Sequence, residues 1–213
     1  MISLPISWEN GEGLAEFSSI NPYLENKSAY LAELQGVFYT MLKIYLTQLR
    51  GLLQKIIDKQ EEHFEDAARL LAQAIVSDGN IYFYGFDEMR MLGTEILSGA
   101  NSLIKAHELI PNNLHLLPMD RVILITSSDN DKRATILAKQ IADTGAMTIG
   151  LSTITHPESQ SFSNVVNVHI NLQSKRALIP GEDGERIGHP DTIAALFAYH
   201  CLFLTLHEVL EDQ

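Results

Sequence analysis

The strongest constraint on the fold is a series of short apolar runs that alternate with helical patterns. Four runs predict buried strands, namely IYFYG (81–85), RVILITSS (121–128), MTIGLST (147–153) and VVNVHIN (165–171). A further short strand is expected near 103–109 or 114–117, and helices are expected over 88–99, 131–145 and about 190–211. Near-continuous apolar strands separated by helices are typical of a parallel sheet covered on both faces. We therefore expect an α/β fold, a three-layer α/β/α sandwich with a mostly parallel sheet of about five strands.

The N-terminal part of the chain divides into two regions of different pattern. Residues 1–36 have no sustained periodicity, whereas apolar residues recur at three- and four-residue spacing from about 37 to 77. The polar segment DKQEEHFED (58–66) is a place where this helix could bend. We expect an N-terminal extension over residues 1–40 and one α/β domain over residues 41–213.

Composition narrows the classes of partner. The formal net charge of −12 over 213 residues argues against nucleic acid and anionic membranes, since both require a cationic surface. The single cysteine, Cys201, excludes an intramolecular disulfide and a multi-cysteine metal site. We see no signal peptide and no apolar run long enough to cross a bilayer, so we expect a soluble cytoplasmic protein.

Two loops that follow predicted strands are candidate ligand sites. Ligands of open parallel sheets bind beyond the carboxyl ends of the strands, often against helix N-termini. The loops after 85 and after 125 therefore supply the candidate ligand-binding residues, namely Gly85, Phe86, Asp87, Thr126, Ser127, Ser128 and Asn130. Short hydroxyl side chains before a helix suit a phosphate group, although Asp129 or Asn130 could equally serve as an ordinary helix N-cap.

The order of elements and these two loops resemble the SIS (sugar isomerase) family of phosphosugar-binding domains. The segment VILITSSDNDKRATILAKQIADTGAMTIGLST is similar to one block of that family along its whole length, and the resemblance covers about residues 41–211. The helical elements resemble the phosphoheptose isomerase branch and small uncharacterised proteins of Gram-positive bacteria. The resemblance implies an SIS-type fold and a sugar phosphate as ligand.

The two loops depart from the family pattern in charge. The first loop has Asp87 and Glu88 where the family has small neutral residues, and the second has Asp129 and Asp131. Like charges about 4 Å apart repel by about 4 kcal/mol at an effective dielectric constant of 20. We therefore expect these acids to weaken phosphosugar binding.

Isomerase chemistry requires a base that moves a proton between adjacent carbons. The resemblance implies that Glu95 and His200 match metal or acid–base positions, whereas Gly99 stands where the catalytic glutamate is expected. His189, before a helix start, is a third candidate; it could face the cleft or pack beside Asp191. Glu95 could instead be an exposed or ion-paired residue, and His200 a hydrogen-bonded core histidine. We expect no cofactor and assign no metal ligands. The alternative is that Glu95 and His200 bind a divalent metal ion.

These patterns leave three functional hypotheses. The first is a non-catalytic or weakly active module that binds a sugar phosphate or a related metabolite. The second is an active phosphosugar (phosphoheptose-type) aldose–ketose isomerase, and the third is a structural protein without a small ligand. We expect a homodimer, because the predicted helices carry more apolar surface than one small sheet can cover. The Gly-rich segment PGEDGERIG (180–188) is the predicted mobile flap.

Overall fold

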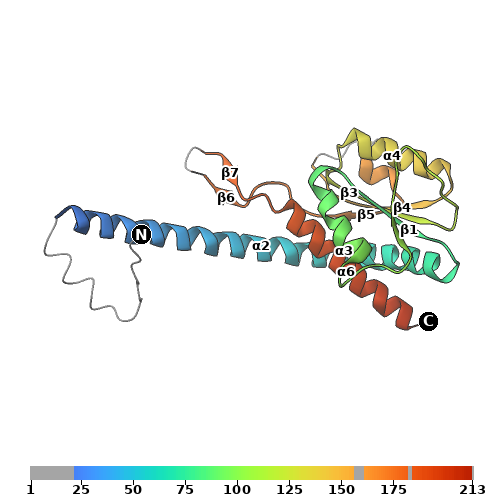
Figure 1. Cartoon of the computed structure of the whole chain (residues 1–213), viewed down its shortest axis with the longest axis horizontal. Coiled ribbons are helices and arrows are strands. Elements are labelled where there is room, and N and C mark those ends of the chain that lie inside the picture. The colour runs from blue at the N-terminus through green and yellow to red at the C-terminus, as the bar shows by residue number, and fades with distance from the viewer. Residues whose placement is uncertain (1–21, 156–160, 182–183, 213) are drawn as a thin grey trace, which may run out of the picture. The chain divides into compact units, whose positions relative to one another are not determined.

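The computed structural model describes residues 22–155, 161–181 and 184–212, and for residues 22–39 it describes the backbone alone. Figure 1 shows the fold coloured from the N-terminus to the C-terminus, with most of the elements labelled. In chain order the elements are α2 (Pro22–Val76), β1 (Ile81–Gly85), the 3-10 helix η1 (Asp87–Met91), α3 (Leu92–Ser98), β2 (Ala106–Glu108), β3 (Arg121–Ser128), α4 (Lys132–Asp143), β4 (Met147–Thr153), α5 (Phe162–Val165), β5 (Val168–Asn171), β6 (Ile179–Pro180), β7 (Arg186–Ile187) and α6 (Asp191–Glu211).

The main sheet has five parallel strands in the order β2-β1-β3-β4-β5. This confirms the predicted sheet, and β2 lies in the first of the two ranges offered for the short strand. The prediction that a strand begins at 165 was wrong. The chain forms α5 first and joins the sheet at Val168, because Asn167 Oδ1 accepts a hydrogen bond of 2.8 Å from the Thr148 amide just outside the ladder.

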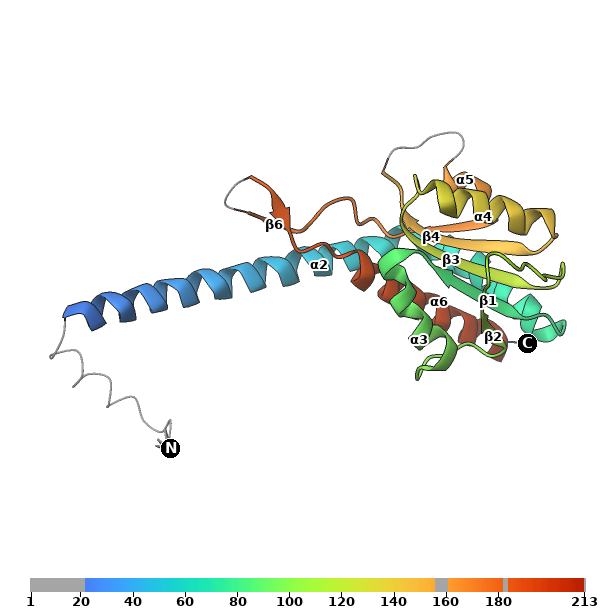
Figure 2. The same cartoon turned by 45° about the horizontal axis from the view of Figure 1, so that its top comes forward.

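The two faces of the sheet bury alternate residues of each strand. Ile81 and Phe83 of β1 pack in a core cluster with buried residues of α2, α3 and α6, whereas Tyr82 and Tyr84 pack against a second cluster that contains residues of α4 and α5. Figure 2 shows α4 and α5 on one side of the sheet and α3 and α6 on the other. The fold is therefore the predicted three-layer sandwich, with one hydrophobic core on each face.

Helix α2 is continuous through the segment where a bend could occur. Ile56, Gln60 and Phe64 are all buried on one stripe, so the polar segment 58–66 keeps the helical repeat. Gln60 Oε1 accepts a hydrogen bond of 2.8 Å from the Asn171 amide, which ties this helix to the end of β5. The helix begins at Pro22, well before residue 37, with proline at a first helical position that needs no amide hydrogen.

The chain separates into two compact units, Met1–Leu46 and Thr47–Gln213. The predicted boundary between residues 40 and 41 stays a prediction. The α/β sandwich belongs to the second unit.

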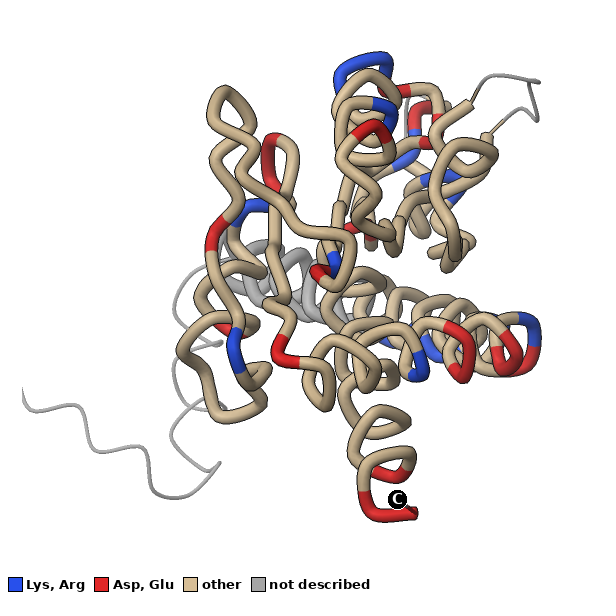
Figure 3. The backbone as a smooth tube through the Cα atoms, turned by 90° about the vertical axis from the view of Figure 1, so that its right-hand side faces the viewer, with Lys and Arg blue, Asp and Glu red and all other residues tan. Residues whose placement is uncertain are grey.

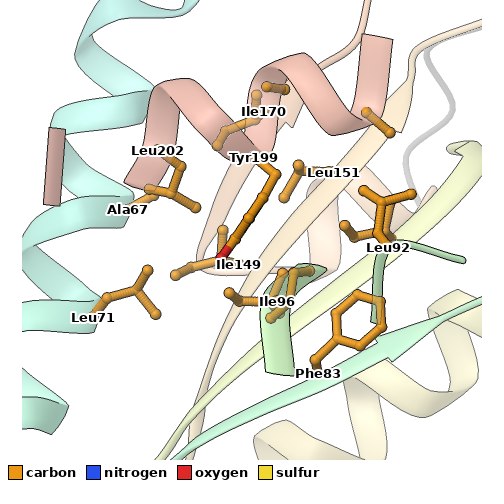
Figure 4. Packing of buried hydrophobic residues seen from close by; sticks show 14 of the residues in the cluster. Ala67, Leu71, Phe83, Leu92, Ile96, Ile149, Leu151, Ile170, Tyr199 and Leu202 are labelled. Atoms are coloured by element: carbon orange, nitrogen blue, oxygen red, sulfur yellow. The ribbon is translucent and has the colours of Figure 1, made fainter. Parts of the chain in front are cut away.

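Helix α6 is the most apolar helix of the sandwich. By length and composition it could cross a bilayer, which differs from the sequence expectation, and 33% of its most apolar window is buried in the structure. A helix of a protein core meets the same criterion. Here Ala195, Tyr199 and Leu202 are fully buried in the core cluster, and Figure 4 shows Tyr199 projecting from α6 into that cluster. Figure 3 shows acidic positions at the C-terminal end of the same helix.

The predicted flap forms a small antiparallel hairpin of β6 and β7. Arg186 links the two ends of this hairpin, because the Arg186 guanidinium donates hydrogen bonds of 2.6 and 2.7 Å to the carbonyls of Ala177 and Leu178. Residues 182 and 183 lie outside the described residues, and mobility of this segment stays a prediction.

Candidate functional site

A cavity of about 630 Å³ lies at the carboxyl edge of the sheet. The residues that line it come from the segments after four of the parallel strands and from the start of α6. They are Glu88 after β1, Ser127 and Ser128 at the end of β3, Thr155 after β4, Ser174, Lys175 and Arg176 after β5, and His189, Asp191 and Thr192 at the start of α6. This is the edge at which ligands of open parallel sheets bind.

The turn between β3 and α4 uses some of its polar side chains for the fold itself. Asp131 caps α4 by accepting a 2.9 Å hydrogen bond from the Arg133 amide, so the N-cap is neither Asp129 nor Asn130. Thr126 is buried and donates to Asp131 Oδ2 over 3.2 Å, and Asn130 donates to Thr155 Oγ1 over 2.9 Å. Of the predicted residues in this loop, Ser127 and Ser128 line the cavity.

Asp129, one of the acids expected to repel a phosphate, does not line the cavity. It is fully buried, and its Oδ1 accepts hydrogen bonds from the amide and the hydroxyl of Thr155 over 3.0 and 3.2 Å. Its Oδ2 has no hydrogen-bond partner among the described residues. The buried Asp129 carboxylate therefore positions Thr155, and Thr155 itself lines the cavity after β4.

The charge of Asp87 is paired within the fold. Its carboxylate accepts hydrogen bonds of 2.5 and 3.1 Å from the Arg133 guanidinium, which also contacts Asp131 and lies 5.5 Å from the centre of the Phe86 ring. The hydrogen bonds from Arg133 lower the pKa of Asp87. The expected repulsion of a phosphate by Asp87 stays a prediction, and the structure shows that Arg133, 46 residues further along the chain, offsets part of the charge that would cause it.

Gly85 is required by the turn that follows β1. A Cβ atom there would lie 2.4 Å from the Met89 carbonyl oxygen and 2.7 Å from the Arg90 nitrogen, because η1 folds back over the end of the strand. Phe86 is buried in the core cluster beside α4. Gly85, Phe86 and Asp87 thus shape the loop that presents Glu88, and they do not line the cavity themselves.

Glu95 and His200 lie close together, as the resemblance implied. His200 Nε2 is 3.6 Å from Glu95 Oε1, and Asn101 Nδ2 lies 2.7 Å from the same Glu95 oxygen and 3.5 Å from His200 Nε2. The hydrogen bond from the Asn101 side chain lowers the pKa of Glu95. Neither residue lines the cavity, and His200 lies about 12 Å along α6 from Thr192, given the 1.5 Å rise per residue.

Gly99 packs directly against Glu95. A Cβ atom at Gly99 would lie 2.1 Å from Glu95 Oε2 and 2.7 Å from the Glu95 Cα. The position of the Glu95 carboxylate therefore depends on the absence of a side chain at residue 99.

Comparison with known proteins assigns the chain to a family. Residues 41–210 match the family described as "Domain of unknown function (DUF2529)". The chain belongs to the DUF2529 family. One relative, the uncharacterised protein YwjG of Bacillus subtilis strain 168, is 35% identical over 172 residues, which are 81% of this chain and 99% of YwjG.

Two solved structures share the fold of this DUF2529 chain. One is a candidate phosphosugar isomerase involved in capsule formation from Bacteroides fragilis, with a TM-score of 0.65 and 15% identity over 82% of this chain and 92% of that one. The other is c3406 of E. coli CFT073 in complex with A5P, with a TM-score of 0.62 and 13% identity over 84% and 94% of the two chains. These likenesses confirm the SIS-type fold predicted from the sequence.

The residues of this DUF2529 chain do not fit a bound metal ion at the predicted place. Glu95 and His200 offer two ligands, whereas catalytic zinc sites use three protein ligands. In the described ranges, no group of three or more His, Cys, Asp or Glu side chains is placed to hold a metal ion.

Sequence reasoning missed the basic side of the cavity. Lys175 and Arg176 are a short basic cluster directly after the fourth predicted strand, and this position was the signal that could have placed them at the carboxyl edge. His189 lines the cavity, and its side chain is 71% exposed, with Nδ1 3.7 Å from Asp191 Oδ2. Asp191 also accepts a 2.9 Å hydrogen bond from the Ser174 hydroxyl.

Proposed function

We propose that this DUF2529 chain is a phosphosugar-binding domain whose ligand occupies the 630 Å³ cavity. One observation carries the proposal: the hydroxyls of Ser127 and Ser128 and the cations of Lys175 and Arg176 line one cavity at the carboxyl edge of the sheet. Hydroxyl donors together with Lys and Arg side chains are the groups that bind phosphate oxygens most strongly.

The availability of these side chains supports the proposal. Within the described part of the chain, the side chains of Ser127, Lys175 and Arg176 have no hydrogen-bond or ion-pair partner, in contrast to Arg133. Arg133 offsets part of the Asp87 charge, and Asp129 is buried and does not line the cavity, so neither carboxylate competes directly with a phosphate for the lining side chains. The bound A5P of the E. coli structure belongs to a protein of the same fold.

Ligand-induced stabilisation tests the proposal. We expect millimolar arabinose 5-phosphate to raise the Tm of the full chain, since a ligand that binds only the folded state stabilises it by about 2.7 kcal/mol at one hundred times its Kd. The double variant Lys175→Ala with Arg176→Ala should lose most of this rise. The control Lys139→Ala removes an exposed lysine of α4 that does not line the cavity and should keep it. An unchanged Tm of the unmodified protein would contradict binding of arabinose 5-phosphate and favour a structural protein.

The second hypothesis, an aldose–ketose isomerase, is favoured by the proximity of Glu95 and His200. A carboxylate beside an imidazole can exchange a proton with a substrate carbon and oxygen. The pair lies outside the cavity lining, so a binding module without turnover is the better-supported function. If the protein converts a sugar phosphate and the Glu95→Gln variant does not, the isomerase would become the better-supported function.

We also propose that the protein is a soluble, cytoplasmic homodimer that buries part of α6. Ile193 and Leu204 of this helix are 41% and 61% exposed, and Phe197 and Phe203 are only partly buried. A second copy could cover this apolar face through a two-fold axis. We expect sedimentation of the purified chain to give twice the monomer mass, and Leu204→Glu to shift it toward the monomer. A monomer at all concentrations would contradict the dimer.

A further inference from the structure

The cavity is lined by acidic and by basic side chains, and these lie in segments that follow different strands. Glu88 belongs to η1 after β1, whereas Lys175 and Arg176 follow β5. In the sheet order, β3 and β4 separate β1 from β5. Three strand spacings of about 4.8 Å place the β1 and β5 ends about 14 Å apart. The acid and the two bases thus belong to segments that follow strands on opposite sides of β3 and β4.

These opposite charges do not neutralise each other. No ion pair joins Glu88 to Lys175 or Arg176, and no described residue forms a hydrogen bond or ion pair with the Glu88 carboxylate. An unpaired carboxylate beside a proposed anion site is unfavourable unless a ligand group compensates it.

The other acidic side chains in or near the cavity lining have partners among the described residues. Asp191, the second acid in the lining, accepts a hydrogen bond from Ser174 and lies 3.7 Å from His189. Asp87 and Asp131 both contact Arg133. Glu88 is therefore the acid of the lining that is available to a ligand.

We propose that the cavity selects sugar phosphates that carry an amine, with Glu88 as the specificity-determining residue. This inference rests on the proposed function. The phosphate lies between the β3 hydroxyls and the Lys175 and Arg176 cations, and the ammonium group donates to Glu88 on the β1 side. An ammonium-to-carboxylate hydrogen bond is stronger than one from a neutral hydroxyl. The same carboxylate repels a phosphate on the β1 side, so it also sets the orientation of the ligand.

Matched ligands isolate the charge of the amine. Glucosamine 6-phosphate and glucose 6-phosphate differ by an amine in place of one hydroxyl, and N-acetylglucosamine 6-phosphate has the same nitrogen without the charge. In calorimetric titration of the full chain, we expect the amine ligand to bind about tenfold more tightly than the other two, as for one charge-assisted hydrogen bond. Glu88→Gln should abolish this ratio. The control Glu61→Gln, at an exposed position of α2, should preserve it.

The possible outcomes separate the inference from the function on which it rests. Binding of all three ligands with equal Kd would overturn the selectivity and leave phosphosugar binding intact. A preference that persists in Glu88→Gln would show that Glu88 does not determine it. Failure of every ligand to bind would refute the proposed function itself.

Discussion

Replacement of Tyr199 by alanine is expected to lower the free energy of unfolding by about 3–5 kcal/mol, because it leaves a large cavity in a well-packed core. Tyr199 is fully buried and belongs to the cluster that joins α6 to α2, α3 and the sheet. Figure 4 shows it among Leu151, Ile96 and Leu202. Its hydroxyl donates a hydrogen bond to the Asn101 carbonyl, and the Asn101 side chain holds Glu95. The same residue therefore supports both the core and the Glu95 region.

Denaturant titration measures this change in the free energy of unfolding. Two further variants serve as comparisons. Tyr199→Phe keeps the ring and removes the hydroxyl, so we expect a loss of about 1–2 kcal/mol from the unsatisfied Asn101 carbonyl. Ile136→Ala removes an apolar side chain that is 58% exposed on α4 and should cost less than about 1 kcal/mol. A Tyr199→Ala protein as stable as the Ile136→Ala protein would contradict this account.

The second large effect is a loss of stability on acidification that depends on His169. Burial lowers the pKa of His169 to about 4 from the ordinary value of 6.5; the nearby Asp129 opposes this shift and His63 adds to it. Between these pH values the unfolded chain binds a proton that the folded chain excludes. The free energy of unfolding should therefore fall by about 3 kcal/mol as the pH drops from 6.5 to 4, since each pKa unit corresponds to about 1.4 kcal/mol.

Comparison with His169→Gln isolates this contribution from other titrating groups. Glutamine does not titrate, and it can still form a hydrogen bond with Ser152, whose Oγ lies 2.8 Å from His169 Nε2. We expect the variant to lose less stability than the unmodified protein between pH 6.5 and 4, whatever its stability at neutral pH. Parallel stability curves for the two proteins would show that His169 is protonated in the folded state.

The central strands could be predicted from the sequence because their apolar runs are long and end at polar or glycine residues. β1, β3 and β4 have the predicted bounds, since residues buried on both faces of a sheet leave a continuous signal. The start of α2 could not be predicted, because proline and glycine residues such as those up to Pro22 are also typical of irregular structure. Proline is compatible with the first turn of a helix, so its presence did not exclude one.

The candidate site was harder to predict because its electrostatics depend on long-range pairs. Asp87 and Asp129 both looked like charges in a ligand loop. Whether they face a ligand depends on Arg133, 46 residues from Asp87, and on Thr155, 26 residues from Asp129. No local pattern indicates which side of a loop a carboxylate takes. Lys175 and Arg176 had the right position after a strand, but only the folded sheet brings them to the same cavity as Ser127.

The contact between Gly99 and Glu95 also restricts how this site can change in evolution. A side chain at 99 and the present Glu95 conformation exclude each other, because the new Cβ would occupy the space of the Glu95 carboxylate. A Gly99→Glu change would therefore not add a second acid to the existing pair; it would first displace Glu95 from Asn101 and His200. A glutamate at residue 99 and the present contacts of Glu95 are thus incompatible without a shift of the Glu95 side chain or of the helix backbone around it.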